Sequence, residues 1–174
     1  MPHLNIEIKA HCPDPDRIRS ILQDAESDYR GLDHQIDTYF RVPKGRLKLR
    51  QGNIECALIQ YQRPNQTGPK NSEVVLVAMG EKADNLRLAL SNALGVLTIV
   101  DKKREIYFVE NVKLHVDEVQ NLGNFVEIEA IDYEGTIGEE KLREQCQQWI
   151  ERLGIKREHL LESSYSDMLM EKEG

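Results

Sequence analysis

Several short stretches of this chain alternate charged and apolar side chains at every second position, and this pattern constrains its fold most. Residues 4–9 alternate apolar side chains with an amide, an acid and a base, residues 46–50 read Arg-Leu-Lys-Leu-Arg, and residues 126–130 alternate apolar side chains with two acids. Successive side chains of a strand point to opposite faces, so each stretch predicts a strand with one apolar and one charged face. The charge is segregated by sign from strand to strand, whereas solvent-facing strands usually mix both signs.

The rest of the chain predicts more strands, interrupted by a few helices. Further strands are expected over residues 35–40, 57–63, 73–78, 99–109 and 112–119. Asp14 and Asp84 would each cap a helix, and further helices are expected over residues 139–153 and in the tail 158–170. This order predicts an α+β fold with an antiparallel sheet. Residues 1–174 are expected to form a single domain.

Two arrangements can produce the charged faces. An antiparallel sheet with one face in water shows the same alternation. If helices instead pack on the apolar faces, the charged faces become the interior of a curved or closed sheet. The segregation of charge favours the second arrangement. Such an interior would suit a metal with a polyphosphate, because carboxylates are ligands for Mg²⁺ or Mn²⁺ and because Arg and Lys bind phosphate oxygens.

Composition excludes several classes of protein. The formal net charge of -7 argues against a general nucleic-acid binder, which needs a basic surface. No apolar run approaches the roughly 20 residues of a membrane helix, and no secretory signal is visible, so we expect a cytoplasmic protein without a membrane partner. The cysteines Cys12, Cys56 and Cys146 form no Cys-x-x-Cys pair, so reduced thiols are expected and a zinc site is not.

Five stretches, in this order and with this spacing, resemble a known family. Residues 5–9 look like its N-terminal Glu-x-Glu-x-Lys strand, and residues 35–40 look like its Asp-x-Tyr-Phe strand. Residues 46–50, 102–104 and 125–129 look like its basic and acidic tunnel strands. The family is the CYTH superfamily of triphosphate tunnel metalloenzymes, and the likeness runs over nearly the whole chain. Within it, the chain is most similar to bacterial proteins of the class IV adenylate cyclase and thiamine triphosphatase type.

The resemblance implies a fold and a set of site residues. The fold would be a closed antiparallel β-barrel of eight strands with helices packed outside, and its tunnel would bind a triphosphate with Mg²⁺ or Mn²⁺. Carried over by position, the metal ligands would be Glu7, Glu127 and Glu129, with Asp117 as a helper. The phosphate-binding residues would be Lys9, Lys48, Arg50, Arg63, Lys102 and Arg104. Glu7, Lys9 and Glu129 would be the catalytic residues.

One position departs from the family pattern. Asn5 stands where the family has its first Glu. An amide oxygen can ligate a metal but brings no charge. The departure therefore predicts one fewer carboxylate ligand and points to a single tightly held metal.

The resemblance leaves the reaction open. ATP could be cyclised to cyclic AMP and pyrophosphate, which is the reaction of the class IV adenylate cyclases that the chain resembles. Thiamine triphosphate, a nucleoside triphosphate or tripolyphosphate could instead be hydrolysed, and a non-catalytic polyphosphate- or nucleotide-binding module is a third alternative. His115 could carry a proton inside the tunnel or could be a hydrogen-bonded structural histidine. An apolar helix face beyond what the barrel covers would favour a homodimer.

Overall fold

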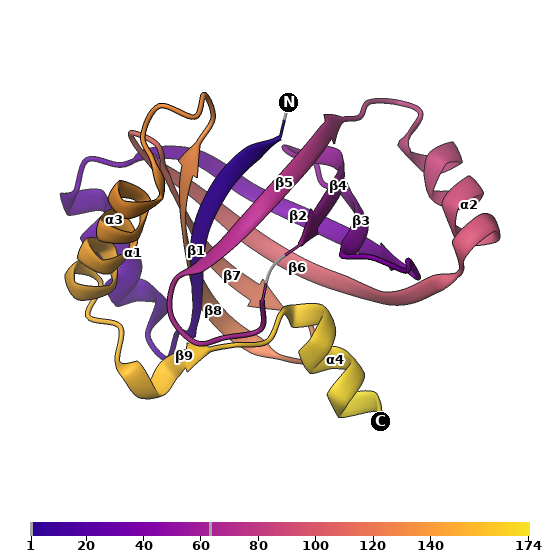
Figure 1. Cartoon of the computed structure of the whole chain (residues 1–174). Coiled ribbons are helices and arrows are strands. Elements are labelled where there is room, and N and C mark those ends of the chain that lie inside the picture. The colour runs from indigo at the N-terminus through magenta and orange to yellow at the C-terminus, as the bar shows by residue number, and fades with distance from the viewer. Residues whose placement is uncertain (1, 63) are drawn as a thin grey trace.

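Eight strands close into a barrel (Figure 1). The computed structural model describes residues 2–62 and 64–174. The strands of the barrel are β1 (His3–His11), β2 (Asp28–Phe40), β3 (Arg46–Gln51), β4 (Cys56–Gln62), β5 (Lys70–Ala78), β6 (Val96–Val109), β7 (Val112–Val119) and β8 (Gly123–Asp132). Their order is β5-β4-β3-β2-β6-β7-β8-β1, and the additional pairing of β1 with β5 closes the ring. Each pairing is antiparallel, which confirms the predicted α+β fold with a closed eight-stranded barrel.

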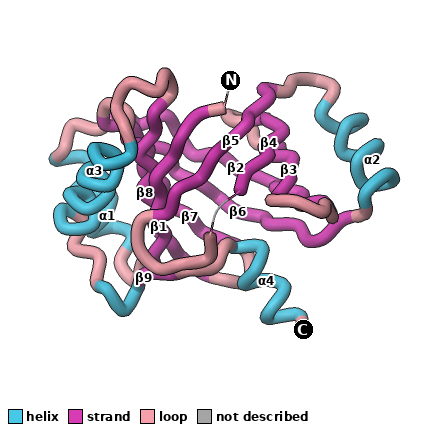
Figure 2. Tube along the Cα trace, in the orientation of Figure 1, coloured by secondary structure: helices cyan, strands magenta, loops and turns pink. Residues whose placement is uncertain are grey.

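The described residues also form four α-helices outside the barrel. They are α1 (Pro15–Asp24), α2 (Ala83–Leu94), α3 (Glu139–Arg152) and α4 (Tyr165–Glu173), and α4 is preceded by the 3-10 helix η1 (Arg157–His159) and the short strand β9 (Leu160–Leu161). Figure 2 shows α1 and α3 together on one side of the barrel and α2 on the opposite side. Within the described part of the chain, no helix is long and apolar enough to cross a membrane.

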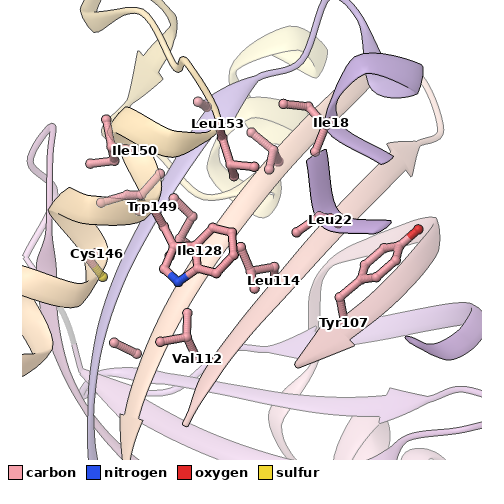
Figure 3. Close-up of a cluster of buried hydrophobic side chains, with 14 of the residues drawn as sticks. Ile18, Leu22, Tyr107, Val112, Leu114, Ile128, Cys146, Trp149, Ile150 and Leu153 are labelled. Atoms are coloured by element: carbon pink, nitrogen blue, oxygen red, sulfur yellow. The ribbon is translucent and has the colours of Figure 1, made fainter. Parts of the chain in front are cut away.

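The main hydrophobic core lies between the barrel and the helices α1 and α3 (Figure 3). Leu22 of α1 and Leu153, which follows α3, are completely buried, as are Leu114 of β7 and Ile128 of β8. Trp149 of α3 packs in the same cluster. The apolar faces of β1, β7 and β8 are therefore covered by helices, as the amphipathic pattern of residues 139–153 predicts.

The register of the strands shows where the charged faces lie. β1 and β8 pair Glu7 with Glu129 and Lys9 with Glu127, so these charged side chains share one face of the sheet. The apolar side chains on the other face, such as Ile8 paired with Ile128, belong to the core under the helices. The charged face is therefore the interior of the barrel. The alternative of an open sheet with one face in water is wrong.

Helix α2 differs from the sequence prediction at its start. The residue before its first turn is Lys82, which makes no side-chain capping bond, so the prediction that Asp84 caps this helix is wrong. Asp84 lies inside the first turn, where its carboxylate accepts a hydrogen bond of 2.8 Å from Gln51 Nε2 of β3. Leu88 on this helix is 59% exposed, and a homodimer contact through this face stays a prediction.

Helix α4 is fastened at its first turn by a reciprocal cap. The Ser164 hydroxyl accepts from the Asp167 N–H at 3.1 Å, and the Asp167 carboxylate accepts from the Ser164 N–H at 3.3 Å. We expect Ser164→Ala to destabilise α4 by about 1 kcal/mol, which would speed amide exchange in this helix about fivefold. Hydrogen exchange measured by mass spectrometry checks this. Ser20→Ala, at an exposed position of α1, should leave exchange in α4 unchanged, and an unchanged rate in Ser164→Ala would contradict the prediction.

Candidate active site

A cavity of about 350 Å³ lies inside the barrel, and we call it the interior cavity. Its lining includes Asn5, Glu7, Lys9, Lys48, Arg50, Lys102, Arg104, Glu127 and Glu129. The structure thus brings together most of the residues that the sequence analysis selects, from strands that are distant in sequence. Asp117 is buried beside the cavity, in contact with Arg104. The prediction for Arg63 falls outside the described residues.

One group of basic side chains is organised by the buried carboxylate of Asp37 on β2. Arg50 donates to both of its oxygens, at 3.0 and 2.9 Å. Lys102 Nζ donates at 2.7 Å, and Lys48 Nζ lies 3.4 Å away. Burial acts to raise the pKa of Asp37, but the three surrounding cations outweigh it and hold this pKa well below its usual range. Asp37 is therefore a charged anchor that orients these three cations, a role that the sequence analysis did not assign.

A second group is built around Arg104 of β6. Its guanidinium donates to both oxygens of Asp117, at 2.8 and 2.7 Å, and lies 3.4 Å from Glu127. Lys9 Nζ lies 3.6 Å from the same Glu127. The hydroxyl of Tyr165 also donates to Asp117, at 2.7 Å. Asp117 thus orients Arg104, while its role as a metal helper stays a prediction.

The acidic side of the interior cavity brings Glu7, Glu127 and Glu129 together. Burial raises the pKa of Glu129 to about 7; nearby Lys113 opposes this shift, whereas Glu7 and Glu127 add to it. Asn5 donates its amide N–H to Glu129, and its carbonyl oxygen is buried without a hydrogen-bond partner. Converging carboxylates and an unsatisfied amide oxygen fit a hard divalent cation such as Mg²⁺ or Mn²⁺. Glu7, Glu127 and Glu129, with Asn5, are the side chains that could hold it.

His115 lies beside this acidic cluster. Burial lowers its pKa to about 4, with help from the nearby Arg104 and Lys113, so it is neutral at pH 7. Its Nδ1 lies 3.2 Å from Glu127, and atoms of His115, Asp117 and Glu127 lie within 4.8 Å of one another, an arrangement that could hold a metal ion. The contact of Nδ1 agrees with the structural alternative, whereas Nε2 is buried without a hydrogen-bond partner, and the role of a proton carrier stays a prediction.

Two interior residues had no signal in the sequence pattern. Glu55 comes from the turn before β4, where no alternation exists, and its carboxylate accepts from Lys113 at 2.5 Å and from Gln35 at 3.0 Å. Burial acts to raise the pKa of Glu55, but Lys113 and Arg50 outweigh it and lower this pKa. Tyr165 comes from the first turn of α4, outside the barrel strands. Only contacts between segments distant in sequence identify both residues.

Comparisons with known proteins agree with this geometry. The sequence profile of the CYTH domain matches residues 3–165. PH1012 of Pyrococcus horikoshii OT3 is 21% identical and superposes with a TM-score of 0.79, covering 94% of this chain and 98% of that chain. A candidate adenylate cyclase of Vibrio parahaemolyticus is 17% identical, with a TM-score of 0.76 over 96% of this chain and 98% of that chain. A comparison with curated proteins gives no match, and likeness at these identities shows the fold alone.

Proposed function

Because this chain belongs to the CYTH domain family, we propose that it binds a triphosphate with a divalent cation in its interior cavity and catalyses a reaction at phosphorus. One observation carries the proposal. A single cavity holds basic side chains that buried acids keep in place, next to the three carboxylates of Glu7, Glu127 and Glu129. A triphosphate complements the first group and a divalent cation complements the second.

The basic side chains would bind the phosphate chain at two places. Lys48, Arg50 and Lys102 converge on Asp37. Lys9 and Arg104 converge on Glu127 instead. An extended polyphosphate could therefore contact both groups at once. Asp37 fixes the guanidinium group of Arg50, and Asp117 fixes that of Arg104. Both groups therefore need little reorganisation when they bind phosphate oxygens.

The carboxylates would act at the other side of the substrate. Glu7, Glu127 and Glu129 would hold the divalent cation, which when bound neutralises charge on the phosphate oxygens. Beside a bound cation Glu129 would stay ionised, so this carboxylate would orient the attacking hydroxyl or water by accepting a hydrogen bond from it. Lys9 and Arg104, beside Glu127, would stabilise the negative charge that develops on the reacting phosphate.

Two reactions are consistent with these roles. In cyclisation, the ribose 3′-hydroxyl of ATP attacks the α-phosphorus, its proton passes to a base, and the bond to pyrophosphate breaks. In hydrolysis, water attacks the terminal phosphorus, its proton passes to a base, the bond to the diphosphate leaving group breaks, and orthophosphate is formed. We place cyclisation first, because within the family the sequence is most similar to class IV adenylate cyclases.

The reaction is tested by incubating the purified protein with ATP, thiamine triphosphate and tripolyphosphate, each with Mg²⁺ or Mn²⁺ and each with a chelator. Cyclic AMP with pyrophosphate would support the cyclase, and orthophosphate would support the triphosphatase. Tight binding of tripolyphosphate without turnover would support the alternative of a non-catalytic binding module. No binding of any triphosphate would overturn the proposal.

Lys9→Ala is expected to weaken tripolyphosphate binding about tenfold, because it removes a charge-assisted hydrogen bond. Isothermal titration calorimetry in the presence of Mn²⁺ measures this. Lys103→Ala is the matched control, since Lys103 is exposed on β6 and should leave the affinity unchanged. If Lys9→Ala keeps its fold and binds tripolyphosphate as tightly as the unmodified protein, Lys9 does not bind the phosphate chain.

A further inference from the structure

We propose that Tyr165 is a positioning residue of the interior cavity, which sets the orientation of two phosphate-binding cations, Lys9 and Arg104. Tyr165 lines the cavity although it belongs to α4, a helix outside the barrel. The inference rests on the proposed function, because it assigns Tyr165 a part in binding the same triphosphate.

The chain before Tyr165 is built into the barrel wall. β5 pairs with β1 only as far as Glu7, and β9 takes over the pairing with β1 at Lys9 and Ala10. The buried Lys70 of β5 donates to the carbonyl of Glu162 at 2.5 Å. The C-terminal segment therefore completes the wall next to Lys9, and Figure 1 shows β9 and α4 together at this end of the barrel.

The other side of Tyr165 is fixed as well. Arg46 of β3 donates to both oxygens of Asp167, at 2.8 and 3.0 Å, and so ties the first turn of α4 to the opposite wall. The Tyr165 ring packs against Phe125 of β8 at a centroid distance of 5.0 Å. Tyr165 is only 4% exposed, so its ring and its hydroxyl have little freedom to move.

The ring of Tyr165 acts on Lys9. Lys9 Nζ lies 4.1 Å from the ring centroid, which is a cation–π contact. The ammonium group also lies 3.6 Å from Glu127. The ring thus supports the lysine from one side while the carboxylate attracts it from another, and together they hold the charge beside the phosphate position.

The hydroxyl of Tyr165 acts on Arg104 through Asp117. It donates to Asp117 Oδ2 at 2.7 Å, the same oxygen that accepts from Arg104 Nη2 at 2.7 Å. A phenylalanine would fill the same space and keep the ring contact with Lys9, but it would leave the Asp117 carboxylate without this donor. The two actions of Tyr165 can therefore be separated by substitution.

The test compares tripolyphosphate affinity, in the presence of Mn²⁺, among Tyr165→Phe, Asp117→Asn and the double variant. We expect Tyr165→Phe to weaken binding about fivefold to tenfold, and to weaken it no further when Asp117→Asn is already present. Tyr165→Leu, which also removes the ring, should weaken binding more than Tyr165→Phe does.

Tyr107→Phe is the matched control. Tyr107 is also buried, and its hydroxyl donates to Glu105 at 2.8 Å, but this bond lies outside the interior cavity. It should lower thermal stability as Tyr165→Phe does while leaving the affinity unchanged. Equal affinity of Tyr165→Phe and the unmodified protein, or an equal loss in both Asp117 backgrounds, would overturn the positioning role alone. Absence of tripolyphosphate binding by the unmodified protein would overturn the proposed function and this inference together.

Discussion

Asp37→Ala is expected to lower the free energy of unfolding by about 3–5 kcal/mol, the typical cost of removing one partner from a buried ion pair. Asp37 is completely buried and neutralises Arg50, Lys102 and Lys48, so its loss leaves these cations facing one another. Lys102 is the most affected, because burial already lowers its pKa well below the usual range and Asp37 opposes that shift. Urea denaturation at pH 7 measures the change.

Two further variants show whether charge is the cause. Asp37→Asn keeps the shape of the side chain but removes its charge, so it should cost nearly as much as Asp37→Ala. Asp101→Ala, on the neighbouring strand β6, removes a carboxylate that is paired with His34 near the surface, and it should cost under about 1 kcal/mol. A loss below about 1 kcal/mol in Asp37→Ala would show that Asp37 does not anchor the cations.

Glu129→Gln is expected to raise the free energy of unfolding of the metal-free protein relative to the unmodified protein. This gain should be about 2–3 kcal/mol larger at pH 8 than at pH 5. The pKa of Glu129 is raised from 4.5 to about 7 in the fold. Between these values the folded state binds more protons than the unfolded state, so the contribution of Glu129 to stability falls as pH rises. Glutamine does not titrate, so the variant does not lose this contribution to stability as pH rises.

The comparison between variants is essential because His115 acts in the opposite direction. Its pKa is lowered from 6.5 to about 4, so its contribution to stability is lost as pH falls through that window. The two effects nearly cancel in the unmodified protein, and only the difference from Glu129→Gln isolates the carboxylate. Glu118→Gln, at an exposed position of β7, should show no such difference. A stability difference that stays constant from pH 5 to pH 8 would mean that Glu129 titrates normally.

Adding Mn²⁺ extends the same experiment. A divalent cation would compensate the charge of Glu7, Glu127 and Glu129, so it should stabilise the unmodified protein at pH 8. The stabilisation should be smaller in Glu129→Gln, because one of the proposed ligands has lost its charge. Thermal melts with and without a chelator compare the two proteins.

The amphipathic pattern predicted the strands and their two faces, but not their lengths. β2 begins at Asp28 rather than at residue 35, and β6 begins at Val96 rather than at residue 99. These two strands pair with each other over almost their whole length, with irregular register between Tyr29 and Gly31. Pairing across the barrel extends a strand through residues whose local pattern is weak, so a prediction from local pattern starts such strands too late.

Candidate residues at alternating positions could be predicted because one face of a strand stays on one side of the sheet. Lys48 and Arg50, for example, must share a face wherever β3 lies. The partners of these residues could not be predicted in this way. That Asp37 anchors Arg50, and that Glu55 pairs with Lys113, depends on which strands become neighbours and on how the ring closes.

The sequence by itself determined that this chain has strands with one apolar and one charged face, segregated by sign, and a resemblance to one family. Tertiary structure alone decided that the charged faces turn inward, because helices α1 and α3 cover the apolar side and because β1 closes the ring with β5. It also decided that Tyr165, from a helix after the last strand, reaches Lys9 and Asp117. Side-chain alternation is a local property of the backbone, whereas contacts across a closed barrel depend on register and ring closure.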